Sequence, residues 1–320
     1  MADPLLSGGI PLRSAVVGVG YLGRFHAQKY ARLENVDLVG VVDTDAARAA
    51  EIAAECQTTA LTDYHELFGK VDCVSIAVPT HCHHAVARDF LTRNIDVLVE
   101  KPLAATGAEG HDLVDRAAQY GRILQVGHLE RFNPALRSLS GILTAPRFIE
   151  CQRVAPFVER GTDVDVIRDL MIHDLDVILS LVRSPVVSRE AFGVPVLTSE
   201  PDIANVRLRF ASGCIANITA SRVALKQERK MRVFQQDTYL VVDYGAHTIR
   251  ICRRAPASDP TGMPNLSFEE REVGGEDALE EEIRAFIRAV QERSTPIVSG
   301  QDGLQALEEA ERIVEVLEIP

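Results

Sequence analysis

The chain has 320 residues, 46% of them hydrophobic and 25% charged, so we expect a soluble protein of two domains with a sizeable core. The formal net charge of −12, without any basic run, argues against nucleic acid and anionic membrane as partners. No apolar stretch approaches the roughly 18 residues of a membrane-spanning helix, and the N-terminus lacks the basic region of a signal peptide. Six scattered cysteines indicate reduced thiols, which predicts a cytoplasmic protein.

The first part of the chain alternates apolar strands with amphipathic helices, a pattern typical of a doubly wound parallel sheet. We expect strands near 14–19, 37–42, 71–77, 95–99 and 122–126. We expect helices near 22–33, 45–55, 63–68, 83–93 and 107–120. Residues 1–127 are therefore predicted to form a dinucleotide-binding Rossmann domain.

A glycine-rich segment, Gly18-x-Gly20-x-x-Gly23, follows the first apolar run and opens a helical pattern. The first glycine allows a tight turn, the second lets the backbone approach a pyrophosphate, and the third allows close helix–strand packing. The N–H groups at the start of the helix favour the phosphate charge. Asp43 ends the second apolar run, 20 residues beyond Gly23, where a carboxylate accepts hydrogen bonds from the adenine ribose. This spacing predicts NAD rather than NADP.

Lys101 lies two residues after the apolar run Val97–Val99 of the fourth expected strand, and it precedes Pro102. A strand of a parallel sheet delivers its C-terminal end to the ligand crevice, and the proline biases the preceding residue toward an extended backbone. We therefore expect Lys101 as a positioned ammonium at the mouth of a site, although a lone lysine after a strand is more often solvated surface. Arg131 and Asn133 follow the strand near 122–126 at the same sheet edge. A structural salt bridge is an equally good reading of Arg131.

The pattern changes after about Pro146, and residues 128–320 are assigned to a second α/β domain. One long helix is expected near 164–182, then strands at 205–211, 214–221, 229–235, 239–242 and 248–252. Hairpin signals such as Ser212-Gly213 predict an open, mostly antiparallel sheet covered by the long helix. Residues 255–264 read as a surface loop, and two helices follow near 277–292 and 302–318, the last a candidate to return to the first domain.

Three polar residues of the long helix, Asp169, His173 and Asp176, fall within about 60° of one another on a helical wheel. An Asp four residues before a His can hold the imidazole and stabilise its protonated form, which suits general acid–base catalysis. An exposed polar face of a surface helix is the alternative. Asp174 falls within the apolar arc, so either the helix is tilted or Asp174 is a buried, paired carboxylate.

The run His81–His84 contains three histidines and a cysteine, which is the composition of a metal site. Adjacent side chains diverge at the start of a helix, and no further ligand has matching spacing, so we predict no metal. Lys101, Arg131 and Arg153 are cations in an otherwise acidic chain. Together they favour an anionic or polyhydroxylated substrate.

Taken together, the chain resembles the Gfo/Idh/MocA family of nicotinamide-dependent sugar dehydrogenases over nearly its whole length. The matching segments are Gly18–Gly23, Ala77–His83, Glu100–Leu103, Asp169-x-x-x-His173, Glu282–Ile287 and Ser299–Ala306. The resemblance implies a Rossmann domain and an α/β domain whose open sheet forms a homo-oligomer, a dimer or tetramer. It also implies that Lys101 and His173 flank the carbon being oxidised, with Asp169 in support.

The resemblance also implies two sets of binding residues. Those for the cofactor NAD are Gly18, Gly20, Tyr21, Leu22, Gly23, Asp43, Thr80, His83, Glu100 and Lys101. Those for the substrate are Lys101, Arg131, Asn133, Arg153, Asp169 and His173, with Arg131, Asn133 and Arg153 as candidates for a diphosphate and uridine.

Within the family, residues 127–135 and 169–176 look most like the UDP-N-acetylglucosamine 3-dehydrogenases, which make a 3-keto sugar nucleotide on the way to the 3-amino sugar of lipid A. We therefore expect NAD-dependent oxidation at C3 of that small-molecule nucleotide sugar. Other members oxidise UDP-N-acetylglucosaminuronic acid at the same carbon, or inositol and free aldoses. A dinucleotide-binding redox sensor is the alternative from another class, but it would not need Lys101, Asp169 and His173 together.

Overall fold

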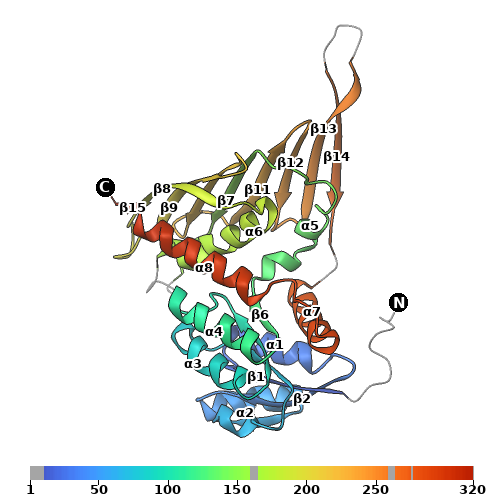
Figure 1. The fold of residues 1–320 in the computed structure, drawn as a ribbon, viewed down its shortest axis with the longest axis vertical. Coiled ribbons are helices and arrows are strands. Elements are labelled where there is room, and N and C mark those ends of the chain that lie inside the picture. The colour runs from blue at the N-terminus through green and yellow to red at the C-terminus, as the bar shows by residue number, and fades with distance from the viewer. Residues whose placement is uncertain (1–10, 159–164, 259–263, 275–276, 320) are drawn as a thin grey trace. The chain divides into compact units, whose positions relative to one another are not determined.

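The computed structural model describes residues 11–158, 165–258, 264–274 and 277–319. It divides into two compact units (Figure 1). The first unit takes the chain up to Leu129 and again from Asp277 to Leu307, and the second takes Glu130–Glu276 and Glu308–Pro320. Among the described residues, none of the helices is both long and apolar enough to cross a membrane.

The first unit contains a six-stranded sheet in the order β3-β2-β1-β4-β5-β6, and every neighbouring pair is parallel. The strands are β1 (Leu12–Val17), β2 (Val36–Val42), β3 (Thr59–Leu61), β4 (Cys73–Ile76), β5 (Asp96–Glu100) and β6 (Leu124–Gly127). The helices between them are α1 (Tyr21–Tyr30), α2 (Ala46–Cys56), α3 (Thr80–Leu91) and α4 (Gly107–Gln119), with a 3₁₀ turn at Tyr64–Leu67. The predicted doubly wound parallel sheet is confirmed, and only the three-residue edge strand β3 was not expected.

The first unit also contains α7 (Ala278–Glu292), which the sequence analysis placed in the second domain. Its apolar face buries Ile283, Phe286, Ile287 and Val290 in the same core cluster as Tyr30 of α1. The amphipathic helix therefore supplies one wall of the Rossmann core, since burial of that face is what stabilises it. The first half of α8 (Gly300–Glu315) belongs to this unit as well.

The second unit contains a nine-stranded sheet in the order β14-β13-β12-β11-β7-β10-β9-β8-β15. Its strands are β7 (Phe148–Val154), β8 (Val186–Val194), β9 (Ile203–Phe210), β10 (Ile215–Ser221), β11 (Glu228–Gln235), β12 (Thr238–Asp243), β13 (Thr248–Ser258), β14 (Pro264–Glu272) and β15 (Leu317–Glu318). The β7–β10 and β8–β15 pairs are parallel and the others antiparallel, which confirms a mostly antiparallel sheet.

The surface loop expected at 255–264 differs from the structure. Strand β13 continues to Ser258 and β14 begins at Pro264, so both ends of the expected loop are strand. The hairpin partner supplies the hydrogen bonds that the Pro- and Ser-rich composition does not reveal. Residues 259–263 of the expected loop lie outside the described residues.

The long helix expected near 164–182 has two parts. It starts with a π-helical turn at Ile167–Met171 and continues as α6 (Ile172–Val182). Asp165 caps the start, since its Oδ1 accepts the N–H groups of Ile167 and Arg168. Figure 1 shows α6 lying across one face of the large sheet, where its buried residues join the apolar side chains of the strands in one core. The short helix α5 (Pro134–Arg137) lies in the same unit.

Candidate active site

The glycine-rich loop between β1 and α1 has two crowded glycines and one open one. Gly18 has a φ of +84°, and a Cβ there would lie 2.7 Å from Ala77 O. A Cβ on Gly23 would overlap the carbonyl oxygen of Gly18. A Cβ on Gly20, in contrast, would meet nothing within 4 Å. The first and third glycines are therefore required by close backbone approach, and the second leaves the space that a dinucleotide pyrophosphate needs.

The N-terminus of α1 is built differently from that of α2. The side chain of Asp45 caps α2 by accepting the N–H groups of Ala47 and Arg48, whereas Gly20 offers α1 no side-chain cap. Tyr21 and Leu22 begin α1 with exposed side chains. An uncapped helix start directs backbone N–H groups and the positive end of the dipole outward, which favours a phosphate group.

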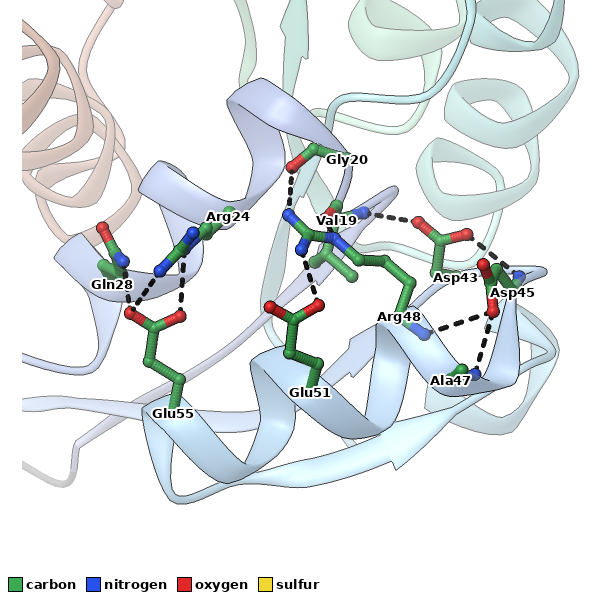
Figure 2. A network of polar contacts seen from close by, with 10 residues as sticks. All are labelled: Val19, Gly20, Arg24, Gln28, Asp43, Asp45, Ala47, Arg48, Glu51 and Glu55. Atoms are coloured by element: carbon green, nitrogen blue, oxygen red, sulfur yellow. Dashed lines mark hydrogen bonds and ion pairs between the residues drawn. The ribbon is translucent and has the colours of Figure 1, made fainter.

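Asp43 lies directly after β2, beside the glycine-rich loop. Its Oδ2 accepts the N–H of Val19 at 2.9 Å, and its Oδ1 accepts the N–H of Asp45 at 3.1 Å (Figure 2). A carboxylate has about four acceptor positions, so both oxygens keep lone pairs for a ribose diol. The residues of this loop and strand end therefore fit NAD.

Glu100 is the last residue of β5, and Lys101 follows it through a chain turn with a cis peptide bond to Pro102. Glu100 Oε1 lies 2.8 Å from Nε2 of the buried His26 on α1. Burial acts to raise the pKa of Glu100, but the hydrogen bond from His26 and the charges of His26 and Lys101 outweigh it and lower that pKa. The carboxylate of Glu100 and the ammonium of Lys101 are thus close enough for their charges to interact.

Glu282 of α7 joins this pair, with possible ligand atoms of His26, Glu100 and Glu282 within 4.8 Å of one another. Sequence reasoning missed both His26 and Glu282. His26 follows Gly23 by one turn of α1, and Glu282 opens one of the segments that resemble the family, so the two signals were in the sequence. The hydrogen bond between His26 and Glu100 explains why these two side chains lie close together, and it needs no bound ion.

His83 joins two turns at the C-terminal edge of the parallel sheet. Its Nδ1 lies 2.8 Å from Pro102 O and its Nε2 lies 2.9 Å from Val78 O. Burial lowers the pKa of His83. Its neighbour His84 pairs instead with Asp112, at 2.7 Å. The histidine run therefore sends its side chains to different partners, and His83 helps to hold the Lys101–Pro102 turn. Thr80 begins α3 and is half-buried.

In the second unit, Asp169 lies in the π-helical turn and His173 in the first turn of α6, both half-buried. The wheel drawn at 100° per residue does not hold across a π-helical turn, because that turn forms i→i+5 hydrogen bonds. Asp176, expected on the same face, is buried and lies 3.3 Å from Arg131 Nη1. The π-helical turn is itself a feature that is frequent at functional sites.

Arg153, expected at a substrate diphosphate, is buried inside the second unit with 4% of its surface exposed. Its Nε and Nη2 each lie 2.9 Å from an oxygen of Asp174, and its Nη1 lies 3.0 Å from Glu130 Oε1. Asp174 is thus the buried, paired carboxylate of the two alternatives. The structure gives Arg153 a role in the core, because a guanidinium held in a bidentate pair has few donors left for a ligand.

Asn133 is also engaged within the fold. Its Oδ1 accepts the N–H of Ala135 and caps α5, and its Nδ2 donates to Glu130 Oε2 at 3.3 Å. Of the three residues expected at the diphosphate and uridine, Arg131 is the most exposed, with 14% of its side chain accessible. Their spacing in the sequence gave no reason to expect this difference in exposure.

Comparison with known proteins gives a family for both parts of the chain. Residues 12–128 match the oxidoreductase family with an NAD-binding Rossmann fold, and residues 140–241 match the GFO/IDH/MocA C-terminal domain. The UDP-N-acetylglucosamine 3-dehydrogenase of Acidithiobacillus ferrooxidans is 40% identical over 299 residues, which cover 93% of this chain and 95% of that protein. The myo-inositol 2-dehydrogenase of Thermotoga maritima is 26% identical over 318 residues, or 92% and 93% of the two chains.

Solved structures agree with these matches. A structure of the Acidithiobacillus ferrooxidans enzyme superposes with a TM-score of 0.91 at 38% identity and covers 97% of this chain and 98% of its own. An oxidoreductase domain protein from Kribbella flavida shares the fold, with a TM-score of 0.85 at 20% identity over 96% and 97% of the chains. The resemblance inferred from the short motifs is confirmed: this chain is an NAD-binding oxidoreductase and belongs to the Gfo/Idh/MocA family.

Proposed function

We propose that the protein oxidises the C3 hydroxyl of UDP-N-acetylglucosamine to the 3-keto sugar nucleotide. The observation that carries this proposal is the 40% identity, across 93% of the chain, to an enzyme named for that reaction. The segments that we propose for binding NAD are the glycine-rich loop, Asp43 and the Glu100-Lys101-Pro102 turn described above. NAD supplies the hydride acceptor when it is bound.

The catalytic roles that we propose fall to Lys101 and His173. A neutral imidazole at position 173 takes the proton of the C3 hydroxyl, and the ammonium of Lys101 stabilises the negative charge that develops on that oxygen. The alternative assignment makes Lys101 the base and His173 its relay. Asp169, four residues before His173, supports the imidazole as it becomes charged.

Arg131 is the residue that we propose for the substrate diphosphate. An Arg guanidinium can bind phosphate oxygens through two parallel hydrogen bonds. Binding energy from such a remote group can position C3 for reaction, so free N-acetylglucosamine is expected to be a very poor substrate. We further propose that an aminotransferase consumes the ketone and yields a 3-amino sugar for lipid A. The buried thiols of Cys73 and Cys151, both unpaired, support a reducing, cytoplasmic setting.

The decisive assay supplies UDP-N-acetylglucosamine and NAD, with an aminotransferase and glutamate to trap the ketone, and detects a 3-amino sugar nucleotide by mass. Product from UDP-N-acetylglucosaminuronic acid alone would transfer the assignment to that substrate. Turnover of inositol or a free aldose, with neither nucleotide sugar active, would defeat both. Binding of NAD without turnover of any of these would favour the redox sensor.

We also propose a homo-oligomer formed through the open face of the nine-stranded sheet. An aromatic row crosses that face: Phe148 and Phe234 lie 5.7 Å apart between ring centres, and Phe234 and Tyr239 lie 4.6 Å apart. Strand register continues the row to Phe268, which is 77% exposed. An exposed apolar row of this kind favours association. Phe268→Glu should lower the molar mass measured by light scattering, and an unchanged mass would count against this interface.

A further inference from the structure

Arg48 lies in the first turn of α2, next to the glycine-rich loop rather than within it (Figure 2). We propose that Arg48 is a positioning residue for the cofactor, because its guanidinium holds the peptide groups of the loop that meets the dinucleotide. This inference rests on NAD as the cofactor of the proposed reaction, but not on which sugar is oxidised.

Three consecutive peptide groups of the loop are fixed from outside. The N–H of Val19, in the first peptide, donates to Asp43 Oδ2 at 2.9 Å. The carbonyl of Val19, in the second, accepts from Arg48 Nε at 2.8 Å. The carbonyl of Gly20, in the third, accepts from Arg48 Nη2 at 3.1 Å. Side chains at the start of α2 and the end of β2 therefore set the orientation of the whole turn.

The orientation matters because a trans peptide points its N–H away from its C=O. Arg48 holds the carbonyls of Val19 and Gly20, so the N–H groups of the same two peptides, which belong to Gly20 and Tyr21, point to the opposite side. These are the N–H groups at the N-cap and first residue of α1, the positions at which helices bind phosphate. Arg48 thus aims the donors without touching the ligand.

Electrostatics support this role. A cation in the first turn of a helix is unfavourable with the helix dipole, so the dipole of α2 does not explain an arginine there. Its remaining nitrogen Nη1 pairs with Glu51 at 2.8 Å, one turn later on α2. Every nitrogen of the guanidinium is therefore engaged, and the side chain is 26% exposed. A guanidinium bound in this way is not placed to take up the 2′-phosphate of NADP.

Binding measurements without any sugar test the proposal. We expect Arg48→Ala to raise the Kd for NAD about tenfold, because a loosened loop spends less time in the binding conformation. The KM for NAD should rise in the same proportion, while kcat at saturating NAD changes by less than about twofold. Arg24→Ala is the matched control. Arg24 lies on α1 and forms a similar ion pair, at 3.0 Å, with Glu55 on α2. That variant should bind NAD like the wild type.

The substitution Arg48→Lys keeps the charge but replaces the planar fork by a single donor group, so its Kd should fall between those of wild type and Arg48→Ala. If Arg48→Ala does not fold, Arg48→Lys alone tests the proposed role of Arg48, through the same rise in the Kd for NAD. A Kd for NAD that rises less than about threefold in the folded variant would overturn the proposal, as would a loss of NADP binding alone. Wild-type protein that binds NAD but turns over no nucleotide sugar would instead defeat the proposed function and leave this inference intact.

Discussion

Asp43 accepts the backbone N–H of Val19 at 2.9 Å, so the carboxylate expected at the adenine ribose is bonded to the loop expected at the pyrophosphate. Recognition of the two parts of the dinucleotide is therefore coupled. A substitution at Asp43 removes a ribose acceptor and also releases one peptide of the loop. Its effect on NAD binding should exceed that of losing a single ligand hydrogen bond.

Asp43→Asn should weaken NAD binding by more than about tenfold, since the amide offers fewer acceptors and no charge. The ratio of the Kd for NADP to that for NAD should fall at the same time, because the carboxylate no longer repels a 2′-phosphate. Titration of both cofactors measures the two effects. Asp37→Asn, an exposed change at the start of the same strand, is the control. A wild type that prefers NADP would contradict the assignment of Asp43.

Lys101→Ala and His173→Ala should each lower kcat by about 10²–10⁴ and leave the Kd for NAD within about twofold, as expected for positioned acid–base groups. Steady-state kinetics and NAD titration on the same preparations give both numbers. Lys70→Ala and His247→Asn replace exposed residues of the same types and should keep full activity. More than half of the wild-type activity in Lys101→Ala would rule out the proposed mechanism.

Asp169→Asn should be milder than His173→Ala, with a loss in kcat of about tenfold, because a residue that orients the imidazole does not itself take the proton. The double variant should be no slower than His173→Ala alone, since Asp169 acts only through the histidine. Comparison of the three variants at saturating substrate measures this. Losses that multiply in the double variant would show an independent role for Asp169.

Arg153→Ala should lower the free energy of unfolding by about 3–5 kcal/mol, because it leaves the carboxylates of Asp174 and Glu130 buried without their partner. Urea denaturation measures the loss. Arg232→Ala is the control on the same sheet: its pair with Glu150 is partly exposed, and its removal should cost less than about 1 kcal/mol. An unchanged urea midpoint with a raised KM for the nucleotide sugar would return Arg153 to the substrate site.

Acidification should lower the free energy of unfolding through the buried His83. Burial lowers the pKa of His83 in the folded protein, against about 6.5 in an unfolded chain. Below about pH 6.5 the unfolded chain therefore binds more protons at this position, and the free energy of unfolding falls until the pH passes the folded pKa. His83→Gln should lose less stability than the wild type between pH 7.5 and 5.5, both assayed by urea midpoint. His247→Gln should keep the wild-type slope; an unaltered slope in His83→Gln would contradict this account.

Short-range pattern was enough to predict the Rossmann fold and NAD as the cofactor. The glycine spacing and Asp43 depend on one strand–turn–helix unit and the strand after it, so the chain encodes them locally. The hydrogen bonds from Arg48 to the carbonyls of Val19 and Gly20 were not predicted. Residue spacing does not indicate where a long side chain on the next helix will point.

The second unit shows why the sequence did not reveal the partners of Arg153. Two residues appeared unusual on their own: a cation on a strand, and Asp174 in the apolar arc of a helix. The structure shows that each explains the other, since they form a bidentate pair 21 residues apart. Long-range pairing of this kind has no local signature. The π-helical turn had none either, so the angles around Asp169 followed from a helix type that the chain does not adopt there.

The position of α7 has a consequence for the order in which the protein is made. Gln125 of β6 donates to the carbonyl of Glu282, 157 residues later in the chain. A ribosome adds about 5–20 residues per second, so the parallel strands emerge well before Phe286 and Ile283, which complete their core. The first unit therefore cannot be completed until residues 130–276 of the second unit have been translated. A fragment that stops at Leu129 would expose the apolar wall around Tyr30, and such a fragment should need a chaperone or aggregate.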